Sequence, residues 1–516
     1  MVCAFLPQTG LLLPFAAFFV PALLWLLFGK NSRGYGVCLL LGALAGLLLT
    51  AHTRQKLDRV HTTYADREVT LTAEVEEVSA SYYPGVVHAV LRVEPTDGEK
   101  TAFRVECVCM PKCTAGERVQ ARFALEVPAR TQQLSSYADG IALSGEYLSG
   151  MKHLGPSESF RAKTARLQRR LSAALRKGMA QGPAGVLAAM VLGDRTHLSK
   201  DLRSAYRAAG LSHVLVVSGM HVSILCGSVF AKYPPEKKKR ERGYASRRRQ
   251  ALFSAAMALL LAGVTGLTPS VLRAATAVWV SALGVWVYGP PDALTSLGVA
   301  GVWMTLGNSY AVCDIGFELS FAAVLGTLAG AELARKSRRF PLLRNSVWET
   351  LCVSACASAA TFPVLVLRGL SASLYALVSS VAVLWLVEPI LQLGLVTALF
   401  GCWPALAPLH RVCSLCAATL AGCLNRWALW VSGWPGAQIY FDTACAALIC
   451  LLLLGLGWLA YHWRVRPRVA LPCLVLTAAL AIGLGNVLNR EIVRVELAGS
   501  RNAPAVVITR GESAVV

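Results

Sequence analysis

The sequence has few charged residues. Only 15% of its 516 residues are Asp, Glu, Lys or Arg, whereas 55% are hydrophobic; soluble domains average about 25% charged residues. The chain therefore lacks the charge that a water-facing surface requires. Its apolar residues form long runs, such as residues 11–28 and 445–460, and about 20 apolar residues cross a bilayer as a helix. These features exclude a soluble globular protein and indicate a membrane protein with several spans.

Two motifs of common catalytic sites are also absent. The sequence contains no G-x-x-x-x-G-K-[ST] loop, which cradles phosphates in many ATPases, so the chain carries no such motor. No two histidines are four residues apart, and His213 and His221 are separated by eight, whereas helical zinc sites use histidines at i and i+4. We therefore expect no metal and no cofactor.

Acidic residues are scarcer than basic ones, at 29 against 50, which gives a net charge of +21 at pH 7. Much of the excess lies in short segments between apolar runs, at 30–33, 232–249, 335–344 and 464–468. Short cytoplasmic loops of membrane proteins are enriched in Lys and Arg. The charge therefore mainly indicates orientation, with these loops inside and residues from 51 onward emerging outside. Contact with nucleic acid is the alternative explanation.

We predict an all-α polytopic membrane bundle of about 12 spans, with a small external all-β domain inserted after the second span. The expected parts are residues 1–50 with two transmembrane helices, 51–156 with the β domain, 157–181 with an interfacial helix, 182–490 with the remaining bundle, and 491–516 with two strands. The stretch 371–401 contains Glu388 and Pro389, and we expect a broken or re-entrant helix there.

The β domain is predicted from about five segments in which apolar and polar residues alternate. An oligonucleotide-binding barrel is one candidate fold. Residues 51–156 carry 12 basic and 14 acidic residues, so their charge does not favour DNA binding, and a docking role is simpler. Cys107, Cys109 and Cys113 share this domain with a spacing that matches no common zinc pattern. In an exported domain, a disulfide within this trio or to another chain is one outcome.

The helix at 157–181 combines an apolar stripe with many basic residues. Basic amphipathic helices beside membrane segments most often lie on the bilayer surface. A groove for a phosphate backbone is the alternative, in which Arg166, Arg169 and Arg170 contact phosphates.

Polar and ionisable side chains gather at residues 188–225. Such groups cost about 2.5–3.5 kcal/mol each on insertion scales and are functional candidates in a membrane. Ser218 and His221 are three residues apart, so they adjoin on one helical face. The roles left open are the lining of a pore, hydrogen bonds between helices, and a Ser–His nucleophilic pair. The candidates in this segment are Asp194, Arg195, His213, Ser218 and His221.

The segment LGDRTHLSKDLRSAYRAAGLSHVLVVSGMHVSIL resembles the Gly-Asp-Arg, Gly-Leu-Ser-His and Ser-Gly-x-His-Val elements of the bacterial ComEC-type competence channel. Three further elements of that family follow in the same order. They are Pro-Ser-x-x-Arg-Ala with Ser270 and Arg273, Asp-x-Gly-Phe-x-Leu-Ser-Phe with Asp314 and Glu318, and Thr-x-Pro at Thr361. The resemblance is specific because four elements recur in order across residues 185–395.

The resemblance implies a multi-pass protein of the bacterial plasma (inner) membrane, with the β domain on the outer side, that takes up one DNA strand during natural transformation. Implied partners are single-stranded DNA, a surface DNA receptor and a cytosolic ATPase motor; a second copy of the chain is a candidate. Arg273 becomes a phosphate contact, because a guanidinium stays charged and binds bidentately. An arginine that snorkels to the membrane surface is the alternative. Asp314 and Glu318 are expected to pair with Arg273 or another arginine, or to gate the channel.

The chain departs from the family at its C-terminal end. Many relatives carry an external metallo-β-lactamase-type domain with a His-x-His-x-Asp-His cluster, and the nine histidines here include no such cluster. We therefore expect no enzymatic activity, with a separate nuclease as a candidate partner and loss by truncation as the alternative. Two rival functions remain: a small-molecule or lipid transporter on the same helices, and an intramembrane hydrolase that uses Ser218 and His221.

Overall fold

The computed structural model describes residues 33–80, 85–94, 102–130, 132–217, 219–225, 240–266, 269–287, 293–336, 345–439, 493–500, 503–510 and 513–515. The chain divides into two compact units, one formed by Met1–Phe321 with Val378–Gly433 and the other by Ala322–Leu377 with Trp434–Val516. The spans predicted before residue 33 and after residue 439 lie outside the described residues, and so does Ser218.

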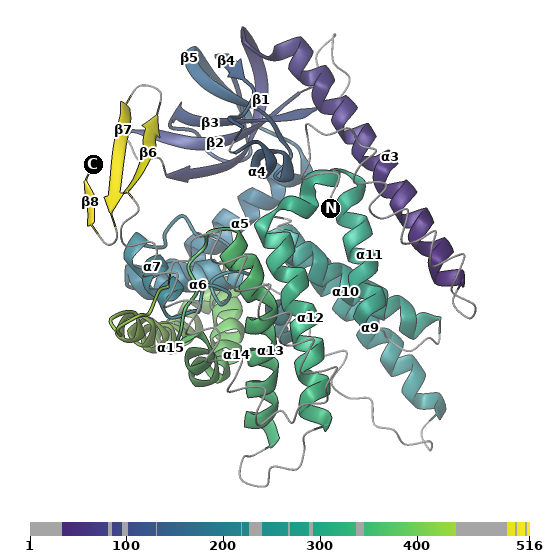
Figure 1. Ribbon diagram of the computed structural model, residues 1–516. Helices are drawn as coiled ribbons and strands as arrows, with labels where there is room; N and C mark the ends of the chain where they lie inside the picture. The colour runs from purple at the N-terminus through teal and green to yellow at the C-terminus, as the bar shows by residue number, and fades with distance from the viewer. Residues whose placement is uncertain are drawn as a thin grey trace. The chain divides into compact units, whose positions relative to one another are not determined.

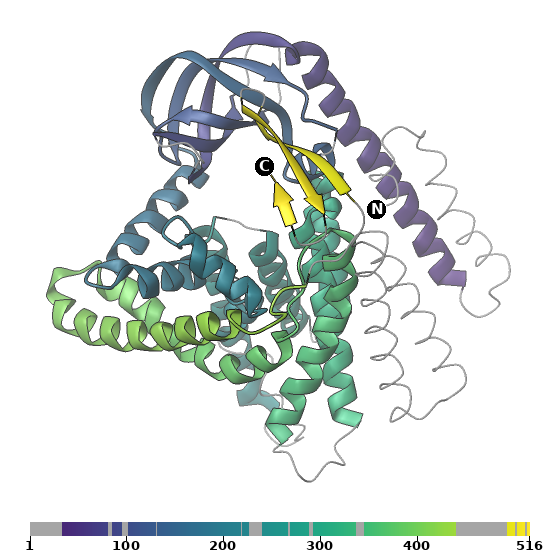
Figure 2. The same cartoon turned by 60° about the vertical axis from the view of Figure 1, so that its left-hand side comes forward.

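A long helix leads into a β-barrel. α3 (Arg33–Tyr64) begins with an apolar half and continues without a break beyond residue 51, where the sequence predicted the start of the β domain. Its last turns bury Val60 and Tyr64 in the barrel core. The barrel and α3 are therefore one packed piece, as two views of the molecule show (Figure 1, Figure 2).

Five strands close the barrel: β1 (Arg67–Ala80), β2 (Val86–Val93), β3 (Phe103–Pro111), β4 (Glu117–Glu126) and β5 (Ile141–Pro156). Their order around the barrel is β1-β2-β3-β5-β4; β3 and β5 run parallel and the other pairs antiparallel. Alternate side chains of the strands point into the core; Leu91 of β2, Val105 of β3 and Phe123 of β4 are examples that are fully buried. The short helix α4 (Gln133–Ala138) lies between β4 and β5. The small β domain predicted from the alternating pattern is confirmed.

The rest of the chain is mostly helical. The helices are α5 (Phe160–Arg176), α6 (Gln181–Leu192), α7 (Lys200–Ala208), α8 (Gly219–Leu225), α9 (Arg240–Val264), α10 (Pro269–Trp286), α11 (Ala293–Leu306), η1 (Ser309–Cys313), α12 (Ile315–Lys336), α13 (Asn345–Leu367), α14 (Ala376–Phe400), η2 (Pro404–Leu406) and α15 (Ala407–Ser432). Ser159 and Ser199 cap the starts of α5 and α7 by accepting backbone N–H bonds, as N-cap serines usually do.

The C-terminal residues form a small sheet in the second unit. Strands β6 (Val493–Ser500), β7 (Ala503–Arg510) and β8 (Ser513–Val515) pair antiparallel in that order. The sequence predicted two strands here, and the third is too short to show an alternating pattern.

Among the described residues, four helical stretches are long and apolar enough to cross a membrane: Ile315–Arg335, Trp348–Leu367, Ala376–Phe400 and Pro404–Ser432. They support a membrane protein, while the total of about 12 spans stays a prediction. The broken helix expected at 371–401 is wrong, because α14 runs continuously through Pro389. Membrane helices tolerate proline when neighbouring groups satisfy the freed carbonyl.

Two glycines allow α12 to approach α13 within the second unit. A Cβ atom built on Gly326 would lie 2.5 Å from the carbonyl oxygen of Cys356, and one on Gly330 would lie 2.7 Å from that of Cys352. Small residues four apart permit such backbone contact between membrane helices.

We expect Gly326→Leu to destabilise the protein strongly. The added side chain would meet backbone atoms of α13, which cannot rotate away, and overpacking costs typically about 1–3 kcal/mol. Gly298→Leu on α11 is the matched control, because a Cβ there has no neighbour within 4 Å. The melting temperature of the purified protein in detergent measures the difference. Equal melting temperatures of the two variants would show that this helix contact carries no stability.

Candidate functional site

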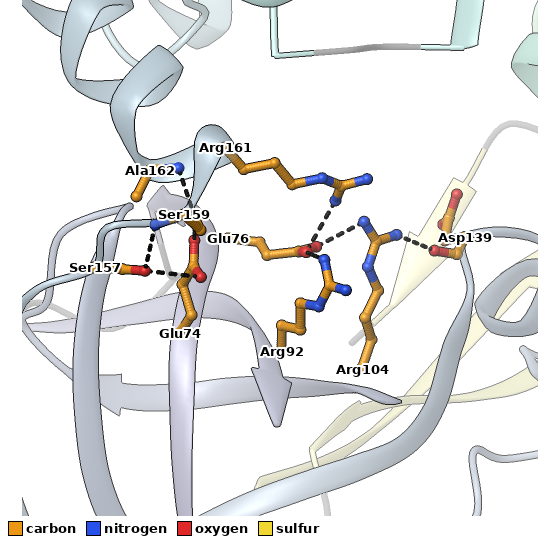
Figure 3. Close-up of polar contacts among 9 residues, drawn as sticks. All are labelled: Glu74, Glu76, Arg92, Arg104, Asp139, Ser157, Ser159, Arg161 and Ala162. Atoms are coloured by element: carbon orange, nitrogen blue, oxygen red, sulfur yellow. Dashed lines mark hydrogen bonds and ion pairs between the residues drawn. The ribbon is translucent and has the colours of Figure 1, made fainter. Parts of the chain in front are cut away.

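Two carboxylates of β1 bind the start of α5, and Glu74 is the first of them. Glu74 is buried and accepts hydrogen bonds from Ser157 Oγ at 3.0 Å and Ser159 Oγ at 2.5 Å. Ser159 also caps α5 by accepting from the backbone N–H of Ala162 at 3.0 Å (Figure 3). Since a helix N-terminus favours negative charge, Glu74 fixes the place where α5 leaves the barrel.

Glu76 is the second carboxylate, and it binds arginines from three different elements (Figure 3). Its side chain is only 4% exposed and lies 2.6 Å from Arg104 Nη2, 2.9 Å from Arg161 Nη1 and 3.7 Å from Arg92 Nη1. Arg104 also donates to the carbonyl oxygen of Asp139 at 2.8 Å. The cluster therefore ties β1, β2 and β3 to α5 and to the turn before β5.

Sequence reasoning missed this cluster, although a signal was present. The alternating pattern of β1 is broken where Glu76 and Glu77 follow each other, and the strand register shifts between Val75 and Glu77. Such a shift marks a β-bulge, which redirects side chains. Two consecutive acidic residues in a predicted strand indicated an irregularity there.

Two of the three arginines of α5 that are predicted phosphate contacts also bind the barrel. Arg166 donates to the carbonyl oxygen of Ser157 at 2.9 Å, and Arg169 donates to that of Ala115 at 2.6 Å. Both hold α5 against loops of the barrel. Arg170 is exposed and makes no such bond within the described part of the chain. The contact of these three arginines with phosphate stays a prediction.

The loop after α6 is bound to α5. Asp194 accepts hydrogen bonds from Ser172 Oγ and from the hydroxyl and backbone N–H of Thr196. Burial alone would raise the pKa of Asp194, but these hydrogen bonds outweigh it and lower the pKa below its ordinary value. Asp194 is therefore an ionised turn residue that α5 holds in place.

Electrostatic interactions link Arg195, which follows Asp194, to the barrel. Arg195 is exposed and lies near enough to Arg203 and Glu77 to interact with both electrostatically. Asp139, in the turn before β5, lies near Glu77 and also near Asp314. Partial burial and the carboxylate of Asp314 raise the pKa of Asp139 to about 6. Arg195 and Asp314 thus each lie within electrostatic range of an acidic residue of the β domain, Glu77 and Asp139 respectively.

The segment η1 completes this junction. Asn308 Nδ2 donates to the carbonyl oxygens of Tyr137 at 2.6 Å and Ala138 at 3.2 Å. The rings of Tyr137 and Tyr310 meet edge to face with centroids 5.6 Å apart. The barrel is therefore docked on the helical part through both α4 and α5.

Asp314 is a helix cap. Its Oδ2 accepts the backbone N–H of Phe317 at 2.8 Å at the start of α12, and Glu318 lies in the first turn of the same helix. Negative charge at this end of a helix is favourable. Asp314 and Arg273 form no ion pair with each other in the structure, because the carboxylate of Asp314 binds the backbone of α12 instead. The other expectations, that Asp314 or Glu318 pairs with another arginine or gates the channel, stay predictions.

The two histidines and Ser270 bind backbone groups around α8. His213 is exposed, with Nδ1 3.2 Å from the carbonyl oxygen of Gly210. His221 is buried and within hydrogen-bonding reach of the Val214 backbone. Ser270 Oγ donates to the carbonyl oxygen of Val217 at 2.7 Å. Because Ser218 lies outside the described residues, the structure does not place the predicted Ser–His pair.

Arg273 is buried within the bundle. Its residue is 5% exposed, and its Nη1 has no hydrogen-bond partner among the described residues. The guanidinium carbon lies 5.7 Å from the centre of the Phe321 ring, which itself stacks on Phe317 at 4.1 Å. A snorkelling arginine would expose its guanidinium. The guanidinium of Arg273 instead lies over an aromatic ring, and its Nη1 donor has no acceptor among the described residues.

The cysteines of the barrel are free thiols, so a disulfide within the trio is not formed. Cys107 and Cys113 are buried and Cys109 is exposed. Burial raises the pKa of Cys107 to about 12 and that of Cys113 to about 11. Both act as core side chains of the barrel. Within the described ranges, no group of three or more His, Cys, Asp or Glu side chains is arranged to hold a metal.

These features define a class: a multi-helical membrane protein that carries a docked five-stranded barrel and a buried, incompletely bonded arginine. The competence protein family matches residues 190–466, which is more than half of the chain, and the chain belongs to this ComEC-type family. It is also 24% identical over 218 residues to ComE operon protein 3 of Bacillus subtilis (strain 168). That match covers 42% of this chain and 26% of the relative, so the chain matches about a quarter of the relative's length. No solved structure matches the chain.

Proposed function

We propose that the chain forms a channel that conducts single-stranded DNA inward across the bacterial plasma membrane during natural transformation. Family membership supports a role in competence, and four apolar helices support a place in a membrane. The inward direction, the outer position of the barrel and the conducted strand are parts of the proposal.

The buried guanidinium of Arg273 is the observation that carries the proposal. Removing a charge from water without full pairing costs several kcal/mol, so a protein retains such a group where a ligand completes its bonds. Arginine matches phosphate geometry with two parallel N–H bonds. The Phe321 ring lies beneath the guanidinium and stacks on Phe317, so it holds Arg273 in place. A phosphate of a passing DNA strand would supply the missing acceptor.

The barrel supports passage through its position rather than through its charge. The barrel lies within electrostatic range of Arg195 and Asp314. Arg195 belongs to the Gly-Asp-Arg element of the family, and Asp314 begins its Asp-x-Gly-Phe element. Closed five-stranded barrels of this kind include the oligonucleotide-binding folds. Its outer face mixes carboxylates with arginines, so we propose that it guides the strand without gripping it.

The implied partners complete the proposal. A cytosolic ATPase would pull the strand, a surface receptor would deliver it, and a separate nuclease would degrade its complement. A second copy of the chain remains a candidate partner.

Import of labelled DNA into vesicles tests the proposal. Vesicles that contain the purified full chain and enclose a complementary quenched probe should become fluorescent when single-stranded DNA is added outside. Protein-free vesicles should stay dark. Uptake of a small anionic dye without any DNA signal would instead favour the small-molecule transporter.

A further inference from the structure

We propose that the outward face of α5 binds the headgroups of anionic phospholipids. Five residues form the α5 stripe: Phe160, Lys163, Leu167, Arg170 and Lys177. Their spacing of 3, 4, 3 and 7 residues places them on one side of a helix, and all five are exposed. Phe160 is 65% exposed and Leu167 is 42% exposed. The stripe therefore presents two apolar and three basic side chains to the outside.

The charges of the stripe have no hydrogen-bond or ion-pair partner in the part of the chain that the structure describes. Arg161, Arg166 and Arg169 on the neighbouring faces bind Glu76 and two backbone carbonyls. Lys163, Arg170 and Lys177 make no hydrogen bond or ion pair within the described ranges, and α5 contains no acidic residue. A row of free cations without carboxylates is complementary to a surface of phosphates.

The C-terminal end of α5 places the stripe beside the membrane. His410 Nε2 lies 3.1 Å from the carbonyl oxygen of Ala174, and a Cβ atom on Gly401 would lie 2.7 Å from that same oxygen. Gly401 lies in the turn between two stretches that are apolar enough to span a membrane. Such turns leave the hydrocarbon region. Trp403 in this turn is 57% exposed, as expected of an aromatic anchor at the membrane interface.

The chemistry of the stripe favours lipid over nucleic acid. Phe160 carries a ring at the start of the stripe, but Leu167 at its centre offers none on which a base can stack, whereas the acyl region of a lipid accepts both side chains. Helices with basic residues around apolar ones bind at the boundary between headgroups and acyl chains. Each cation near an anionic bilayer strengthens binding roughly fivefold.

Lipid binding by the full chain in detergent tests this inference. Native mass spectrometry should detect phosphatidylglycerol retained more strongly than phosphatidylcholine. The variant Lys163→Gln/Arg170→Gln/Lys177→Gln should bind phosphatidylglycerol at least about tenfold more weakly. The matched control Lys112→Gln/Arg130→Gln/Lys152→Gln removes the same charge from exposed positions of the barrel and should bind like the wild type. Both variants should melt at the wild-type temperature without lipid, because none of the six side chains has a hydrogen-bond or ion-pair partner among the described residues.

Two results would overturn the inference. One is undiminished phosphatidylglycerol binding by the stripe variant. The other is a loss of affinity for a fluorescent oligothymidylate with lipid binding unchanged, which would assign the stripe to DNA. Neither result depends on DNA passing through the bundle, so failure here is distinct from failure of the channel proposal.

Discussion

Replacing Arg273 with Met is expected to reduce transformation at least about tenfold while leaving the protein no less stable. Hydrogen bonds to charged groups contribute about 1.5–3 kcal/mol, which corresponds to roughly 10- to 150-fold if the lost bonds were made to DNA phosphate. The substitution also removes a buried charge with an unfilled donor, and an apolar side chain of similar length replaces it. Exchanging buried charges for apolar groups is often neutral or stabilising.

A conservative variant and a control variant accompany this test. Arg273→Lys keeps the charge but loses the planar fork, so we expect transformation between those of the wild type and Arg273→Met. Arg411→Met removes an exposed arginine from α15 and should leave transformation unchanged. Transformation frequency and melting temperature in detergent are measured together. A large loss of stability in Arg273→Met would assign Arg273 to packing instead of transport.

Replacing Glu76 with Gln is expected to loosen the barrel from α5. Breaking a buried ion pair by removing one partner costs about 3–5 kcal/mol. The three arginines around Glu76 are 30% to 49% exposed, so water compensates part of the loss and we expect about 2 kcal/mol. Limited proteolysis should cut between β5 and α5 sooner than in the wild type, and the melting temperature should fall.

Glu68→Gln is the matched control for this change. Glu68 pairs with Arg122 at 2.8 Å on the same barrel, but both side chains are 56% exposed, and exposed pairs contribute less than about 1 kcal/mol. The two variants lose the same charge, so a difference between them reports the burial of Glu76 and its additional arginine partners. Equal effects would contradict the role given to Glu76.

The sequence predicted the barrel well because each strand has one buried face. Leu91, Val105 and Phe123 occupy alternate positions that point into the core, and alternation is a local signal. The family elements around Asp194, Arg273 and Asp314 could likewise be recognised, because each is a short motif of consecutive residues.

The contacts that the sequence did not reveal join distant segments. The partners of Arg166 and Arg169 are backbone carbonyls of barrel loops, and any residue type supplies a carbonyl, so no pattern marks them. Asp314 was expected to pair with an arginine or to gate the channel, and its role as a helix cap was not predicted, although an Asp three residues before a backbone N–H at a helix start is a common cap. Pro389 was given too much weight as a helix breaker in an apolar segment.

The most direct test of the proposed channel is the reactivity of the Arg273→Cys variant in the membrane toward small charged thiol reagents. If position 273 lies on a water-filled path for DNA, an aminoethyl reagent should modify it, restore a positive charge and recover part of the lost transformation. A sulfonatoethyl reagent should modify it without recovery. If the cysteine reacts with neither reagent until the protein is unfolded, position 273 is sealed from water and the proposed path does not pass it.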